Sequence, residues 1–88
     1  MVEYVGQVVQ GELNTVEDEF ILTNIKHLIT QSVIQHKQLD LLQQYLQSKA
    51  EQKESCILTV NDQIPVKLNE GEVLLLIKEL AEIQQKLS

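Results

Sequence analysis

Apolar side chains recur at helical spacing in the last part of the chain. Val73, Leu76 and Leu80 follow a three-four spacing, which places them on one face of a helix. Asn69 is a favourable N-cap, and Glu72, three residues later, completes a capping box. The pattern predicts a helix that begins after Asn69 and buries one wide face.

A longer stretch, residues 16–53, contains neither glycine nor proline. Asn14 and Thr15 are both good N-caps, and acidic residues follow them where a helix N-terminus favours negative charge. These features predict one long helix over about residues 15–53. A helix of that length would measure roughly 57 Å, which is long for so small a domain.

The apolar residues of this stretch form two stripes, one within residues 21–29 and one within residues 39–46. The stripes do not line up on a straight helix, and residues 30–38 between them are mostly polar. A break near residues 35–37 would convert the long helix into an antiparallel pair. No strong helix breaker occurs there, so we favour a continuous helix and keep the break as the alternative.

Strand-forming residues flank the predicted long helix on both sides. Residues 56–68 read as a β-hairpin that turns at Asn61 and Asp62, and a slightly longer loop fits equally well. Pro65 either places the second strand at a sheet edge or points its missing donor toward solvent. The valine-rich residues 2–10 read as a further strand, bulged at Gly6, although they could also begin a helix. The natural neighbour of that strand is the first strand of the hairpin.

The predicted fold is therefore a single α+β domain over residues 1–88, in the order β-α-β-β-α. A small antiparallel sheet, made of the hairpin 56–68 and the N-terminal strand, packs on two helices.

The charge balance argues against nucleic-acid binding. The chain has a net charge of −6 and contains no arginine, the residue that makes the commonest specific base contact. No charged leader with an apolar core opens the chain, and no apolar stretch approaches the roughly eighteen residues of a membrane-spanning helix. We expect a soluble cytoplasmic protein, and the single Cys56 fits a reducing compartment.

Candidate chemistry is sparse. His27, His36 and Cys56 are the soft or borderline metal ligands, and the two histidines would lie on opposite sides of a straight helix. His36 and Asp40 could form a surface pair, and no nucleophile motif or phosphate-binding loop occurs in the sequence. We therefore expect no metal, no cofactor and no enzymatic activity.

The second apolar stripe is the best candidate for a contact surface, because one small sheet cannot easily cover both stripes. Leu39, Leu42, Tyr45 and Leu46 form this surface, and Leu75 is a further candidate on the last helix. We expect a small acidic interaction module that forms a helix-mediated homo-oligomer, most simply a homodimer. The alternative is a small regulatory protein that sequesters or modulates a transcription factor, with direct DNA contact less favoured.

Overall fold

A computed structural model describes residues 1–60 and 64–87, and the fold is α+β as predicted. The elements in chain order are β1 (Val2–Val5), β2 (Val9–Asn14), β3 (Glu19–Ile25), β4 (Leu28–Gln35), α1 (His36–Glu51), β5 (Cys56–Val60), β6 (Ile64–Leu68) and α2 (Glu70–Leu87). Strands β1 to β4 form a four-stranded antiparallel sheet in sequence order, and β5 pairs with β6 in a separate two-stranded sheet.

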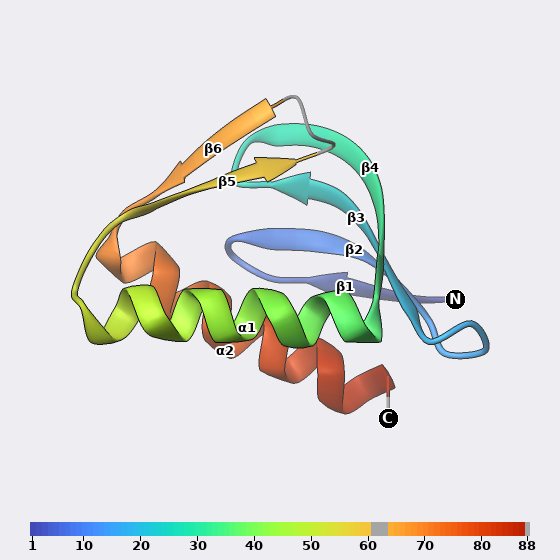
Figure 1. Ribbon diagram of the computed structural model, residues 1–88. Coiled ribbons are helices and arrows are strands. Elements are labelled where there is room, and N and C mark those ends of the chain that lie inside the picture. Colours follow the sequence, from blue (N-terminus) through green and yellow to red (C-terminus); the bar gives the residue numbers. More distant parts are fainter. Residues whose placement is uncertain (61–63, 88) are drawn as a thin grey trace.

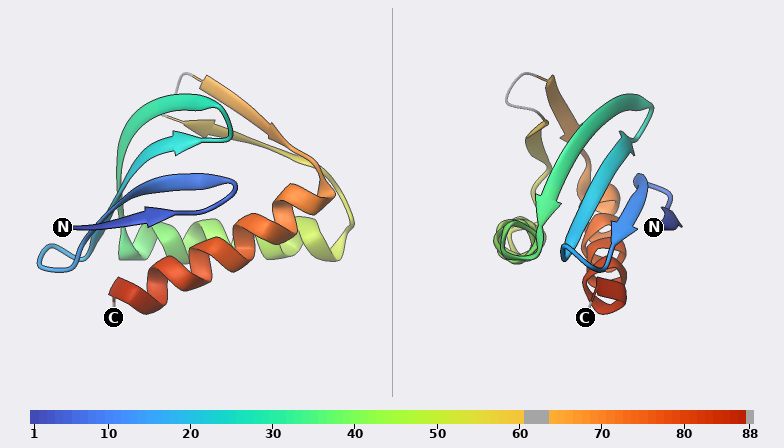
Figure 2. Two further views of the ribbon diagram at one scale, coloured as in Figure 1. Left: turned by 180° about the vertical axis from the view of Figure 1, so that it is seen from behind. Right: turned by 90° about the vertical axis from the view of Figure 1, so that its right-hand side faces the viewer.

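The four-stranded sheet arches over the two helices, which lie side by side beneath it (Figures 1 and 2). The β5–β6 hairpin returns over α1 toward the sheet (Figure 1). Buried residues of β2 and β3 face the helices, among them Leu13, Phe20 and Leu22. They meet Leu39 and Leu46 of α1 and the apolar stripe of α2 in one core.

The predicted long helix over residues 15–53 is wrong, because residues 19–35 form β3 and β4. Their apolar side chains alternate along the strands. Phe20 and Leu22 are buried while Ile21 between them is partly exposed. Many of these residues are β-branched, and such side chains pack well on a pleated surface and lose rotamer freedom in a helix.

The turns on either side of β3, one from β2 and one to β4, contain no glycine. Asp18 and Lys26 adopt left-handed backbone angles, with φ of 55° and 57°. The Asn14 side chain, expected to cap a helix, accepts a hydrogen bond from the N–H of Glu17 at 3.2 Å, but this bond closes the turn between β2 and β3. Asparagine can make the same local bond in a turn and in a helix cap, so the capping signal was ambiguous.

The helix α1 begins at His36, within the segment where the sequence offered a break. What precedes the break is β4 and not a second helix. The N–H of Gln35 donates to the side chain of Gln38 at 2.9 Å, which satisfies one backbone group at this junction.

The N-terminal segment is two strands, because the chain turns after Val5, and β1 pairs with β2 and not with β5. The predicted three-stranded sheet is therefore wrong. The hairpin over residues 56–68 is confirmed, and Pro65 lies on β6, which pairs with β5 alone among the described strands. The predicted turn at Asn61 and Asp62 lies outside the described residues.

The local structure at the start of α2 follows the prediction. The N–H of Glu72 donates to Asn69 Oδ1 at 2.8 Å, and the N–H of Asn69 donates to Glu72 Oε1 at 2.9 Å. Lys26, in the turn between β3 and β4, forms an ion pair with Glu72 at 3.1 Å. The Asn69 backbone and Lys26 lower the pKa of the Glu72 carboxyl.

The buried carboxylate of Glu79 links α2 to the turn between β1 and β2 by hydrogen bonds. Glu79 is 3% exposed and accepts hydrogen bonds from the backbone N–H groups of Gln7, Val8 and Val9, at 2.8 to 3.2 Å. These consecutive donors form a small anion-binding concavity that the protein fills with its own side chain. A Cβ atom on Gly6 would overlap the Glu79 carboxylate, so glycine is required in this turn.

Candidate functional site

Strand β4 forms one edge of the four-stranded sheet. It pairs with β3 on one side, and no described strand pairs with its other side, which we call the free edge of β4. Its eight residues, LITQSVIQ, include no charged residue and no proline. The opposite edge, β1, has four residues and carries Glu3. Natural sheets commonly protect their edges with charges, prolines, short strands or β-bulges. Strand β4 has no charge and no proline, and its pairing with β3 shifts register between Leu22 and Asn24.

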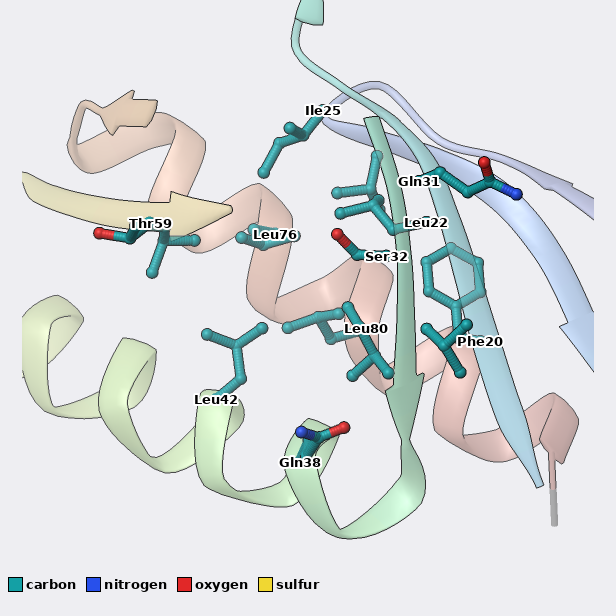
Figure 3. Close-up of a pocket in the computed structure, with 14 residues that line it drawn as sticks. Phe20, Leu22, Ile25, Gln31, Ser32, Gln38, Leu42, Thr59, Leu76 and Leu80 are labelled. Carbon is teal, nitrogen blue, oxygen red and sulfur yellow. The ribbon is translucent and has the colours of Figure 1, made fainter. Parts of the chain in front are cut away.

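The side chains of β4 alternate between the two faces of the sheet. Thr30, Ser32 and Ile34 are half-buried, whereas Ile29 and Val33 are 83% and 54% exposed. Figure 3 shows that the side chain of Ser32 points toward a hollow between β4 and β5. Gln31 points to the other side of the strand (Figure 3). The strand therefore presents exposed aliphatic groups on its outer face, next to the edge at which no described strand pairs.

The hollow lies beside the free edge of β4 and has a volume of about 470 Å³. Leu58 and Thr59 of β5 bound it across from β4, and Leu42 of α1 lines it from below (Figure 3). None of the described residues that line it is charged. Strand β5 thus lies across the hollow from β4. In the described part of the chain, the free edge of β4 has no partner strand.

The five predicted contact residues do not form one exposed surface. Leu39 and Leu46 are both 0% exposed and belong to the core. Leu42 is partly buried in the hollow, and Leu75, on α2, is partly buried against the core. Tyr45 is 41% exposed, with the Lys49 ammonium 5.7 Å from its ring centre.

A cluster of ionisable side chains surrounds His36 at the start of α1. Its Nδ1 lies 3.3 Å from Asp18 Oδ1, and its Nε2 lies 4.0 Å from Asp40 Oδ1. The predicted pair of His36 and Asp40 is thus a loose contact. The side chain of Gln84 donates to the same Asp40 oxygen at 2.6 Å, so the cluster joins the β2–β3 turn to both helices.

The cluster around His36 is partly exposed to solvent. It lines a shallow hollow of about 480 Å³ together with Glu17, Gln35 and Lys37, and none of the described residues of this lining carries a hydroxyl or a thiol. Among the described residues, no group of three or more His, Cys, Asp or Glu side chains is placed to hold a metal ion. The thiol of Cys56 is 5% exposed, and burial raises its pKa, which disfavours the nucleophilic thiolate.

No helix within the described ranges is long and apolar enough to span a membrane. Comparison of the chain with protein-family models, with curated proteins and with solved structures finds no match. Sequence reasoning missed the free edge of β4 because it assigned residues 28–35 to a helix, although the β-branched residues of the segment were a usable signal.

Proposed function

We propose that this protein is a protein–protein interaction module without catalytic activity, which binds its partner by adding a strand to the free edge of β4. The observation that carries the proposal is an eight-residue edge strand with no charge and no proline. Main-chain hydrogen bonds supply affinity in this mode of binding, and the alternating side chains supply specificity.

The surroundings of the strand favour the same mode of binding. The described residues that line the hollow beside β4 are uncharged, so an incoming strand would meet no unpaired charge among them. The exposed Ile29 and Val33 would gain apolar cross-strand neighbours. Burial of Leu39 and Leu46 favours the sheet edge over the helix stripe as the contact surface, because both leucines already serve the core.

The test is a selection of short extended peptides from a displayed library against the immobilised full chain. Amide hydrogen exchange is then compared with and without a selected peptide. Exchange should slow in β4 and remain unchanged in β1. Val33→Lys should weaken binding because it places a charge on the edge strand, whereas Gln10→Lys, on the outer face of central strand β2, should not. The proposal is overturned if neither a peptide nor a second copy of the chain slows exchange in β4.

A further inference from the structure

The sequence of β4 reads the same in chemical type from both ends. Around Gln31, the hydroxyl residues Thr30 and Ser32 are equidistant, as are the β-branched residues Ile29 and Val33. Leu28 and Ile34 complete the series with two aliphatic side chains of the same size. The seven residues 28–34 therefore form a chemical palindrome with Gln31 at its centre.

A palindrome is what a two-fold symmetric strand pair requires. In such a pair, residue i of one copy faces residue j of the other, and residue j faces residue i. Antiparallel neighbours that lie directly opposite each other also share one face of the sheet. A strand that pairs with itself is therefore well matched only if its sequence is symmetric in chemistry about the two-fold axis.

We infer that the strand added at the free edge of β4 is β4 of a second copy, antiparallel, with the two-fold axis at Gln31. This inference rests on the proposed function and names its partner. On the outer face, Ile29 lies opposite the partner's Val33, and Gln31 lies opposite the partner's Gln31. On the inner face, Thr30 lies opposite the partner's Ser32. The two four-stranded sheets then join in one continuous sheet.

Neighbouring registers match the side chains poorly. An axis at Thr30 would place Ile29 opposite the partner's Gln31, and an axis at Ser32 would place Val33 opposite the partner's Gln31. Both registers set an aliphatic side chain against an amide. Only the register centred on Gln31 pairs like with like at every position of residues 28–34, so the pattern specifies one alignment.

The charge of the chain sets the conditions under which the pair forms. Each copy carries a net charge of −6, so two copies repel each other at low ionic strength. The paired strands themselves are uncharged. Association should therefore strengthen as salt is added, and a contact limited to one strand pair should dissociate on dilution.

The position of Gln31 on the axis allows a charge-swap experiment on the full chain. Gln31→Lys sets two lysines opposite each other in the pair, and Gln31→Glu sets two glutamates opposite each other. Each variant alone should weaken dimerisation at least about tenfold, because like charges directly opposite on neighbouring strands repel. An equimolar mixture of the two should restore it, because a lysine then faces a glutamate.

Sedimentation equilibrium over about a hundredfold range of concentration measures the mass of each sample. Gln10→Lys is the matched control, since it makes the same charge change on the outer face of β2 and should leave dimerisation unchanged. Circular dichroism confirms that each variant is folded. If a Gln31 variant does not fold, Ile29→Lys mixed with Val33→Glu tests the same register, because these positions face each other across the pair.

The inference is supported if the mixture dimerises at least as well as the wild-type chain and better than either variant. It is overturned if the wild-type chain is monomeric throughout, or if the mixture dimerises no better than its components. A monomeric chain whose β4 is still protected by a selected peptide would overturn the second copy as the partner and leave the proposed function standing. A chain that binds neither peptide nor second copy at β4 would overturn both.

Discussion

Replacing Glu79 with glutamine should destabilise the fold far more than the loss of one surface charge would. The carboxylate lies in the core side of α2 and accepts hydrogen bonds from three consecutive backbone N–H groups. Its Oε1 accepts hydrogen bonds from the N–H groups of Val8 and Val9, and its Oε2 accepts one from the N–H group of Gln7. Glu79→Gln keeps one oxygen but places an amide NH₂ against a backbone donor.

The structure sets the size of the effect. A hydrogen bond to a charged group contributes about 1.5–3 kcal/mol, and an unsatisfied buried donor costs a similar amount. Glu79→Gln loses one such bond and weakens the others, so the free energy of unfolding should fall by about 2–4 kcal/mol. A domain of this size has a total stability of about 4–13 kcal/mol. The midpoint temperature of unfolding should accordingly fall by about 10–25 °C.

Urea unfolding followed by circular dichroism measures the change. Glu82→Gln is the matched control, because Glu82 lies one turn later on α2, is exposed, and accepts a bond from the Tyr4 hydroxyl at 3.2 Å. Glutamine can still accept that bond, so the control should lose less than about 1 kcal/mol. Equal losses in the two variants, or a Glu79→Gln loss below about 0.5 kcal/mol, would refute the role assigned to the buried carboxylate.

Three further outcomes follow from single positions. Gly11→Ala should destabilise the protein by about 2 kcal/mol or more in urea unfolding, because the added Cβ would overlap the Ile21 backbone. Gly71→Ala should be neutral or stabilising in the same assay, because a Cβ has room there in the first turn of α2. Leu46→Ala should lower the free energy of unfolding by about 2–5 kcal/mol in the same assay. Leu41→Ala, at a 58% exposed position of the same helix, should lower it by less than about 1 kcal/mol. Similar losses in the two variants would contradict the burial assigned to Leu46. The pKa of Glu72 is lowered in the folded protein, so its contribution to stability is present above its unfolded value and is lost as the pH falls through the folded value. Glu72→Gln should therefore flatten the fall in stability between about pH 5 and pH 3, and an unchanged slope would count against the ion pair.

The helix α2 could be predicted from the sequence because its signals are local. Asn69 and Glu72 form their reciprocal hydrogen bonds within one turn, and the apolar stripe that follows fits no other regular element. The β5–β6 hairpin was predicted for a similar reason, because two strand-forming runs lie close together in the chain.

Strands β3 and β4 were missed because their turns lack the usual signals. Asp18 and Lys26 adopt left-handed backbone angles that are far commoner for glycine, and lysine gives no warning of a turn. The absence of glycine and proline over residues 16–53 favours a helix, but it also permits strands. The alternation of buried and exposed positions around Phe20 and Leu22 is the signal for a strand, and it competes with the helical spacing of the apolar residues within residues 21–29.

The candidate site could be predicted only in part. The chemical palindrome around Gln31 is visible in the sequence, but it has meaning only once residues 28–35 are known to form a strand. That this strand lies at an edge depends on the order of the whole sheet, which no local pattern encodes. Leu39 and Leu46, expected from the sequence at a contact surface, are buried in the core instead.

Amide hydrogen exchange in β4, measured on the wild-type chain at low and high protein concentration, tests the central claim most directly. If β4 is the surface of association, exchange in residues 28–34 should slow as the concentration rises, while exchange in β1, at the opposite edge of the sheet, should stay the same. Exchange in β4 that does not change with concentration, in a sample whose mass shows that it has dimerised, would contradict the claim.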